Sequence, residues 1–170
     1  MVIILNGPCG VGKTTLSKQL AKQLVNSVHI IGDEVHNFIV DSKINKEHIE
    51  VTNQNIVALT SNFLNYGFMN IIIDYVYEEE SVLQEVVHTI QKMDPEVIAI
   101  CITCSLKENI IRNKSRADAD IMDEGRVKEL NEILRRENNN VGILLDTSNL
   151  SIENSLSQLL KLIEKAGDPV

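Results

Sequence analysis

The chain lacks any block of lysine and arginine, contains no tryptophan and has only three cysteines. Its 170 residues hold 16 Lys and Arg against 24 Asp and Glu, which gives a formal net charge of -8. Proteins that bind a polynucleotide backbone neutralise phosphates with clustered cations, so this deficit disfavours a nucleic-acid partner. Hydrophobic residues still make up 44% of the chain, enough to bury one core. We therefore expect a single domain over residues 1–170.

Long apolar segments and a disulfide framework are also missing. The apolar run at residues 2–5 is followed at once by Asn6, Gly7 and Pro8, and it is too short for a secretory or membrane-spanning segment. The cysteines are odd in number and have no spread that would suggest paired disulfides. These features predict a cytoplasmic protein in a reducing compartment, without a membrane partner.

Apolar runs of strand length alternate with longer segments of helical pattern along the chain. This order is the βαβ rhythm of a parallel sheet. Strands are predicted at Val2–Leu5, Val28–Ile31, Met69–Ile73, Val97–Ile102 and Gly142–Leu145. Helices are predicted at Gly12–Val25, Lys46–Asn65, Glu78–Lys92, Leu106–Arg116, Arg126–Asn138 and Ile152–Lys165. The sequence thus predicts an α/β fold with a five-stranded parallel sheet.

The first predicted strand leads into a segment, residues 7–14, that matches the pattern G-x-x-x-x-G-K-[ST] at every fixed position. In such a phosphate loop, glycines let backbone N–H groups point at phosphate oxygens, and the helix N-terminus adds its positive dipole end. Lys13 then reaches the β- and γ-phosphates, and the Thr14 hydroxyl is placed to bind Mg²⁺. The motif predicts that ATP and Mg²⁺ are held by Gly7, Cys9, Gly10, Val11, Gly12, Lys13, Thr14 and Thr15.

Two carboxylates follow predicted strands, at the edge of the sheet where ligands of open α/β folds bind. Asp33 comes just after the second strand and is a candidate general base for an attacking hydroxyl. Capping of the next helix is an equally good interpretation of Asp33. Asp74 directly follows three isoleucines, as a Walker B carboxylate does, and we expect it to hold Mg²⁺ through water. Its alternative is a polar residue that merely marks the end of a strand.

Arg112 and Arg116 are four residues apart, so on one helix they share a face and can direct two guanidinium groups at one ligand. The small, acidic segment 117–120 follows them, and we expect a lid over approximately residues 112–126 that excludes water from the phosphates. The alternative is a solvated charged face that pairs with Glu108 and nearby acids. Further basic residues, for which a surface role is simpler, follow at Arg126, Arg135 and Arg136.

Together these residues resemble the small P-loop kinases that act on metabolites, a group with shikimate kinase, gluconate kinase, chloramphenicol phosphotransferase and the nucleoside monophosphate kinases. The resemblance covers nearly the whole chain and implies a three-layer P-loop NTPase sandwich with strand order 2-3-1-4-5. It implies that Arg112 lies against the adenine and that Arg116 is the lid arginine on the phosphates. The loop after the fifth strand, including Ser148, would contact the base. The implied catalytic residues are Lys13, Asp33 and Arg116.

Two departures from this group of kinases narrow the range of compounds that could be the acceptor. No glycine-rich stretch follows Asp74 of the kind that shikimate kinase uses, and residues 41–70 contain no arginine to grip an acceptor phosphate. A hydroxyl compound with little or no charge is left, such as a sugar acid, a nucleoside or an antibiotic. Its contacts would be Asp33, His36, Phe38 and Tyr75. We expect an ATP-dependent phosphotransferase, monomeric or homodimeric; the alternative is a nucleotide-binding regulatory protein or slow NTPase without an acceptor.

The remaining cysteines and the last helix have simpler interpretations. Cys101 and Cys104 have C-x-x-C spacing, but strand residues three apart face opposite sides, so we predict two thiols packed as small hydrophobes. Cys9 lies where a positive field favours a thiolate, although plain packing is simpler. The last helix carries an apolar stripe that predicts core packing, with a dimer interface as the alternative: Ile152, Leu156, Leu159, Leu160 and Ile163.

Overall fold

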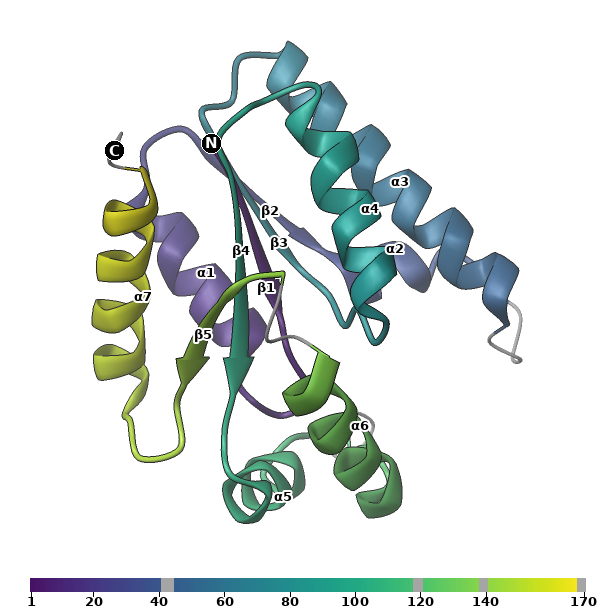
Figure 1. The fold of residues 1–170 in the computed structure, drawn as a ribbon, viewed down its shortest axis with the longest axis vertical. Helices are drawn as coiled ribbons and strands as arrows, with labels where there is room; N and C mark the ends of the chain where they lie inside the picture. The colour runs from purple at the N-terminus through teal and green to yellow at the C-terminus, as the bar shows by residue number, and fades with distance from the viewer. Residues whose placement is uncertain (41–44, 118–120, 138–140, 168–170) are drawn as a thin grey trace.

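A five-stranded parallel sheet forms the centre of the molecule (Figure 1). The computed structural model describes residues 1–40, 45–117, 121–137 and 141–167. The strands are β1 (Val2–Asn6), β2 (Ser27–Ile31), β3 (Asn70–Asp74), β4 (Val97–Thr103) and β5 (Ile143–Asp146). They lie in the order β2-β3-β1-β4-β5, and every pairing is parallel. This confirms the predicted fold class and strand order.

Helices cover both faces of the sheet (Figure 1). The first face carries α1 (Lys13–Gln23) and α7 (Ile152–Gly167), and the second carries α3 (Lys46–Asn65) and α4 (Glu80–Gln91). The short α2 (Gly32–His36), α5 (Leu106–Lys114) and α6 (Glu124–Glu137) follow strands β2 and β4 near their carboxyl ends. None of the described helices is long and apolar enough to cross a membrane.

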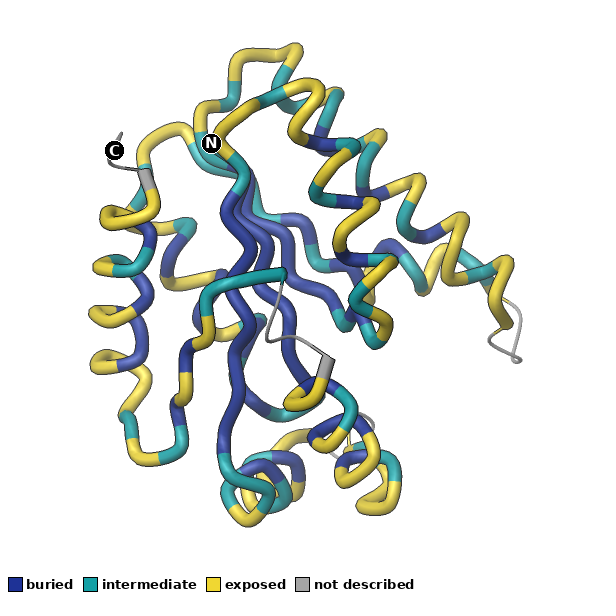
Figure 2. The backbone as a smooth tube through the Cα atoms, viewed as in Figure 1, coloured by how far each residue is buried: buried dark blue, intermediate teal, exposed yellow. Residues whose placement is uncertain are grey.

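The core consists of two apolar layers separated by the sheet. Every residue of β1 is buried (Figure 2), because a central parallel strand is covered on both faces. Alternate residues point to opposite faces, so Ile3 packs with α1 and α7 while Ile4 packs with α3 and α4. The apolar stripe of α7 enters the first layer as predicted, except that Ile152 is 51% exposed.

Helices α2 and α5 differ from the predicted elements. Helix α2 was not predicted, because a five-residue helix is too short to show helical periodicity. Helix α5 ends at Lys114, so the predicted helix was two residues too long and Arg116 lies just beyond it. Of the predicted lid, residues 118–120 lie outside the described residues.

Candidate functional site

An open cleft of about 1390 Å³ is formed by the phosphate loop, α2, α3, the segment after β3, the helices α5 and α6 and the start of α7. Most of the predicted site residues line it: Cys9, Gly10, Val11, Gly12, Lys13, Thr14, Thr15, Asp33, Arg112 and Arg116. Gly7, Asp74 and Ser148 are not among the lining residues. The sheet therefore brings together residues that are more than one hundred positions apart in the sequence.

The phosphate loop needs glycine at two positions where it turns. Gly10 has a φ of +82° and Gly12 a φ of +98°, a left-handed conformation that residues with a Cβ rarely adopt. The start of the loop is fixed by Asn6, whose Oδ1 accepts hydrogen bonds from the backbone N–H of Gly7 (2.8 Å) and of Tyr77 (2.9 Å). Asn6 thus ties the loop to the segment after β3, a role that the sequence motif did not reveal.

Lys13 begins α1 and is only 9% exposed. Its Nζ donates hydrogen bonds to the carbonyl oxygens of Gly7 (2.8 Å) and Pro8 (3.1 Å). Burial lowers the pKa of Lys13, and the negative charges of Asp33 and Asp74 oppose that shift. Both carboxylates therefore lie close enough to act electrostatically on the lysine.

Asp74 and Thr14 provide oxygen atoms suited to Mg²⁺. Asp74 is 3% exposed at the end of β3, and its Oδ2 has no hydrogen-bond partner among the described residues. The nearest cationic candidate is His29 of β2, whose Nε2 lies 3.4 Å from that oxygen. The described residues contain no cluster of three His, Cys, Asp or Glu that holds a metal alone. A phosphate-loop site does not require one, because phosphate oxygens and water complete the Mg²⁺ shell; the orphaned oxygen fits this ion.

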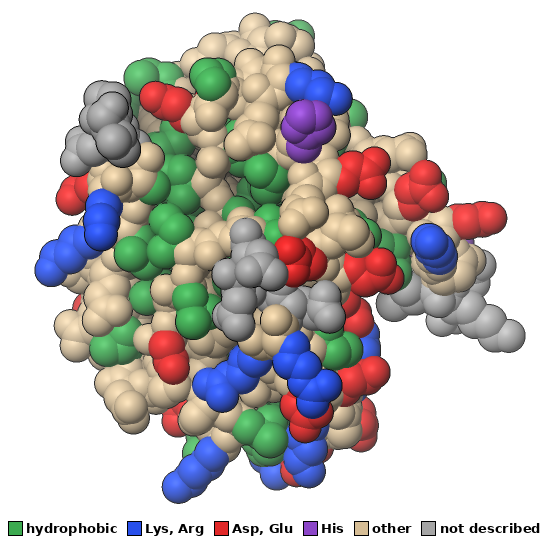
Figure 3. Space-filling view, in the orientation of Figure 1, with side chains coloured by type: hydrophobic (Ala, Val, Ile, Leu, Met, Phe, Trp, Pro, Cys, Tyr) green, Lys and Arg blue, Asp and Glu red, His purple; other side chains and the backbone are tan. Residues whose placement is uncertain are grey.

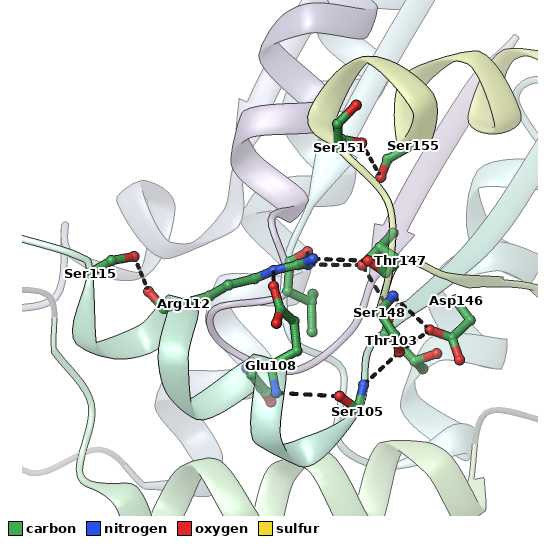
Figure 4. Close-up of polar contacts among 12 residues, drawn as sticks. Thr103, Ser105, Glu108, Arg112, Ser115, Asp146, Thr147, Ser148, Ser151 and Ser155 are labelled. Carbon is green, nitrogen blue, oxygen red and sulfur yellow. Dashed lines mark hydrogen bonds and ion pairs between the residues drawn. The ribbon is translucent and has the colours of Figure 1, made fainter.

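Arg112 bridges the phosphate loop and the loop after β5 (Figure 4). Its Nη1 donates to the Val11 carbonyl (3.3 Å) and to Thr147 Oγ1 (3.0 Å), and its Nη2 donates to the Thr147 carbonyl (2.8 Å). Its Nε donates to Glu108 at 2.9 Å. These bonds hold the guanidinium plane between the two loops that the resemblance assigns to the nucleotide. The pairing of Arg112 with Glu108, predicted as the alternative, is present as well.

Ser148 lies beside this bridge, but its polar atoms are already engaged (Figure 4). Its hydroxyl donates to Asp146 Oδ1 (2.5 Å) and accepts the backbone N–H of Ser105 (2.8 Å). The structure thus gives Ser148 a role in fixing the loop after β5, and contact with the base stays a prediction.

A chain of buried asparagines connects helices α5 and α6 to the phosphate loop. Asn131 of α6 donates to Asn109 Oδ1 (3.0 Å), and Asn109 of α5 donates to the Cys9 carbonyl (2.5 Å). Nearby, Arg116 is exposed, and its Nη1 donates to Cys9 Sγ. The predicted lid arginine therefore reaches the phosphate loop. The roles of Asn109 and Asn131 were not predicted. The sequence carried no signal for these two residues apart from their place among the apolar positions of a helix.

The end of α5 and the entry to α6 are joined by one side chain. Asn113 donates from Nδ2 to the Met122 carbonyl (2.8 Å), and its Oδ1 accepts the backbone N–H of Met122 (3.1 Å). This paired bond fixes the spacing between α5 and the entry to α6.

The other half of the cleft is built around Asp33 and Tyr75. Asp33 lies in the first turn of α2, and no side-chain hydrogen bond caps that helix, so the capping alternative gains no support. A Cβ on Gly32 would lie 2.5 Å from the Tyr75 ring, which shows how closely α2 lies on the ring. Burial, with the charges of Asp33 and Glu78, raises the pKa of Tyr75 to about 12. His36 also lines the cleft, but Phe38 is 74% exposed and does not.

The C-x-x-C cysteines are packing residues, as predicted. Cys101 lies in the apolar layer under α3 and α4, and Cys104 lies in the layer under α1 and α7. Both thiols are free and buried, and burial raises the pKa of each to about 11.

The amino-acid sequence matches the family model described as an AAA domain over residues 3–135. This chain belongs to the AAA domain family. No curated protein sequence matches this AAA domain.

Solved structures share the whole fold of this AAA domain at low sequence identity. A sugar kinase from Janibacter sp. HTCC2649 superposes with a TM-score of 0.76 at 16% identity, over 96% of this chain and 94% of its own. The tunicamycin resistance protein of Deinococcus radiodurans gives 0.73 at 17% identity, over 95% and 94%. A gluconokinase from Sinorhizobium meliloti 1021 gives 0.71 at 14% identity, over 96% and 94%. These similarities establish a P-loop fold of the kind that the sequence resembled.

Proposed function

We propose that this AAA domain transfers the γ-phosphoryl group of ATP to a hydroxyl of a small molecule bound beside Asp33. The observation that carries this proposal is the joining of two halves in one cleft. Lys13 and Arg116 line the cleft beside the phosphate loop, to which we assign the nucleotide, and Asp33 of α2 and Tyr75 after β3 line the part to which we assign the acceptor. The cleft of about 1390 Å³ exceeds the ordinary range of roughly 300–1,000 Å³ for a single ligand, which supports two substrates side by side.

The nucleotide would be held by the backbone of the phosphate loop and by Lys13, with its base near Arg112. Phosphoryl transfer depends on positioning and on charge stabilisation rather than on covalent chemistry by the protein. Thr14 would hold Mg²⁺ directly and Asp74 would hold it through water, and the ion would supply positive charge to the phosphate oxygens. Arg116 adds a cation from the lid side, where charge develops in the transition state.

The acceptor would be activated by Asp33. The acceptor oxygen forms a bond to the γ-phosphorus while its proton passes to the Asp33 carboxylate. The bond between the γ-phosphorus and the bridging oxygen breaks, and its electron pair leaves with ADP. The products are a phosphate monoester and ADP. The names of the similar structures, a sugar kinase and a gluconokinase, support a small hydroxyl acceptor.

ADP release from Mg·ATP across sugars, sugar acids, nucleosides and antibiotics tests this proposal. One acceptor should stimulate ADP release, and Lys13→Ala and Asp33→Asn should each lower that rate by roughly 100-fold or more. Glu34→Gln is the matched control, because Glu34 is exposed on the same helix as Asp33 and does not line the cleft. ATP binding with no stimulation by any acceptor would contradict the proposal.

The alternative function is a nucleotide-binding regulatory protein. One observation favours it, namely that the Asp33 side chain is exposed rather than enclosed. It predicts slow ATP hydrolysis that is the same in wild type and in Asp33→Asn.

A further inference from the structure

The acceptor half of the cleft is rich in negative charge. Asp33, Glu78 and Glu79 all line it. In Figure 3, acidic side chains gather over the flank formed by α3 and α4, whereas Lys and Arg side chains, mixed with acidic ones, gather over α5 and α6. Lys13, Arg112 and Arg116 thus lie on the side assigned to the nucleotide, where Glu108 pairs with Arg112, and the carboxylates of Asp33, Glu78 and Glu79 lie on the side assigned to the acceptor.

Each cationic side chain that lines the described part of the cleft has a hydrogen-bond or ion-pair partner. Lys13 and Arg112 donate to the phosphate loop and its neighbours, and Arg116 donates to Cys9. Arg126 lies nearest the acceptor half, and it forms ion pairs with both Glu78 and Glu129. Lys13, Arg112 and Arg116 are assigned above to the nucleotide, and Arg126 is paired with two carboxylates. No other lysine or arginine lines the described part of the cleft to bind an anionic acceptor.

Hydrogen bonding fixes His36 as an acceptor toward the cleft. The Thr52 hydroxyl donates its single hydrogen to the His48 carbonyl (2.8 Å), so toward His36 Nδ1, at 2.9 Å, it can only accept. His36 Nδ1 therefore carries a hydrogen. In the neutral ring, Nε2 is then the unprotonated nitrogen, which accepts a hydrogen bond.

Asn53 adds a further acceptor from α3. It lines the same cleft, and its Oδ1 is buried without a hydrogen-bond partner among the described residues. A buried amide oxygen without a partner is unfavourable, so a ligand that donates to it gains affinity. The acceptor half thus offers carboxylates, an imidazole nitrogen and an amide oxygen, which together require a ligand rich in donors.

We propose that the acceptor is a polyhydroxylated amine, an amino sugar or aminocyclitol, whose ammonium group is bound by Glu79. This inference rests on the proposed function and narrows its substrate class. Glu79 is assigned because, unlike Glu78, it forms no ion pair with any described residue. Asp33 then faces the reacting hydroxyl, and His36 and Asn53 accept hydrogen bonds from the remaining donors. A sugar acid is excluded by its charge, since it would face three carboxylates without a free cation.

Matched compounds that differ in charge test this inference. Glucosamine and 2-deoxystreptamine are the amines, glucose and myo-inositol the neutral counterparts, and gluconate and glucuronate the acids. At least one amine should stimulate ADP release with a kcat/KM about tenfold or more above its neutral counterpart, because a hydrogen bond between two charged groups is stronger than one between neutral groups. Added salt should raise KM for the amine more than for the neutral compound.

Two variants assign the preference to one side chain. Glu79→Gln should lower kcat/KM for the amine by about tenfold while leaving the neutral compound nearly unchanged. Glu85→Gln, on the exposed side of α4 and outside the cleft, should leave the preference intact. An amine preference that survives in Glu79→Gln would overturn the assignment.

The outcomes separate this inference from the proposed function. If an acid or a neutral compound stimulates ADP release best, the kinase stands and the amine inference fails. If no compound of any charge stimulates ADP release, both fail together.

Discussion

At the residue scale, Lys13 shows a conflict between stability and function. Its ammonium group is buried, and burial lowers its pKa despite two nearby carboxylates. A buried charge that is held only by carbonyl oxygens destabilises the folded state. We predict that Lys13→Met abolishes phosphotransfer but raises the free energy of unfolding by about 1 kcal/mol, seen as a melting temperature about 2–4 °C higher without nucleotide.

The pH dependence of that difference follows from the direction of the shift. The pKa of Lys13 is lower in the folded state than its ordinary 10.5, so between these two values the unfolded chain binds more protons and stability rises with pH. The free energy of unfolding that Lys13→Met gains over wild type should therefore be largest near neutral pH and should shrink as the pH approaches 10.5. A variant that melts below wild type at neutral pH would contradict this explanation.

The three cysteines should differ in reactivity. Cys101 and Cys104 are buried with a pKa of about 11, so only about one thousandth of each is thiolate near pH 8. Cys9 is partly exposed in the phosphate loop. A thiol reagent near pH 8 should label one thiol in the native chain and all three after unfolding, and ATP should protect the reactive one. Native labelling that persists in Cys9→Ser would refute this assignment.

Residue roles were predictable where the chemistry lies in one contiguous segment. The spacing from Gly7 to Thr14 predicted the phosphate loop, because the residues that form this loop follow one another directly in the sequence. Asn6, Asn109 and Arg126 were not predictable in the same way, because their partners lie far along the chain. Buried hydrogen bonds between distant segments leave no periodic signal in a sequence.

At the element scale, Gly32 lets α2 lie on Tyr75. A Cβ there would be 2.5 Å from the Tyr75 ring, and the buried ring cannot move away easily. Gly32→Ala should reduce the free energy of unfolding by about 1–3 kcal/mol and raise KM for the acceptor, since α2 carries Asp33. Thermal unfolding and steady-state kinetics measure the two effects.

Gly125→Ala is the control for that substitution. Gly125 lies in α6, where a Cβ would meet only Asp123 Oδ1, the oxygen that accepts the backbone N–H of Arg126. Because the end of a side chain can shift and alanine favours a helix, the change should alter the free energy of unfolding by no more than roughly 1 kcal/mol. If Gly32→Ala matched this control, the close contact with Tyr75 would not be important.

The lid helices should depend on the asparagine chain. Asn109→Ala leaves the Cys9 carbonyl without its donor, and we expect a loss of about 1–2 kcal/mol in stability together with a higher KM for ATP. Asn55→Ala, an exposed position on α3, is the control and should change neither quantity. An unchanged KM for ATP in Asn109→Ala would show that the chain does not position the phosphate loop.

Elements of the sheet could be predicted from sequence, and the short connecting helix could not. Strands β1 and β3 are buried on both faces, so their continuous apolar runs were informative. Helix α3 was predicted to the residue because twenty positions sample the helical period several times. Helix α2 has five residues, and its position is set by the contact between Gly32 and Tyr75 rather than by a local pattern.

At the scale of the whole molecule, the sheet order places the phosphate loop between the two functional halves. Strand β1 lies at the centre of the sheet, with β3 on one side and β4 on the other. The segment after β3 and α2 form the acidic half, and α5, α6 and the loop after β5 carry the arginines. This arrangement would let the two proposed substrates meet at Lys13.

The central claim is transfer of the γ-phosphoryl group to an acceptor rather than to water. Phosphorus NMR of Mg·ATP with the amine and neutral compounds measures this transfer directly. We predict a phosphate monoester signal that grows in step with ADP in wild type and is lost in Asp33→Asn. Formation of inorganic phosphate alone, at the same rate in both proteins, would contradict the claim.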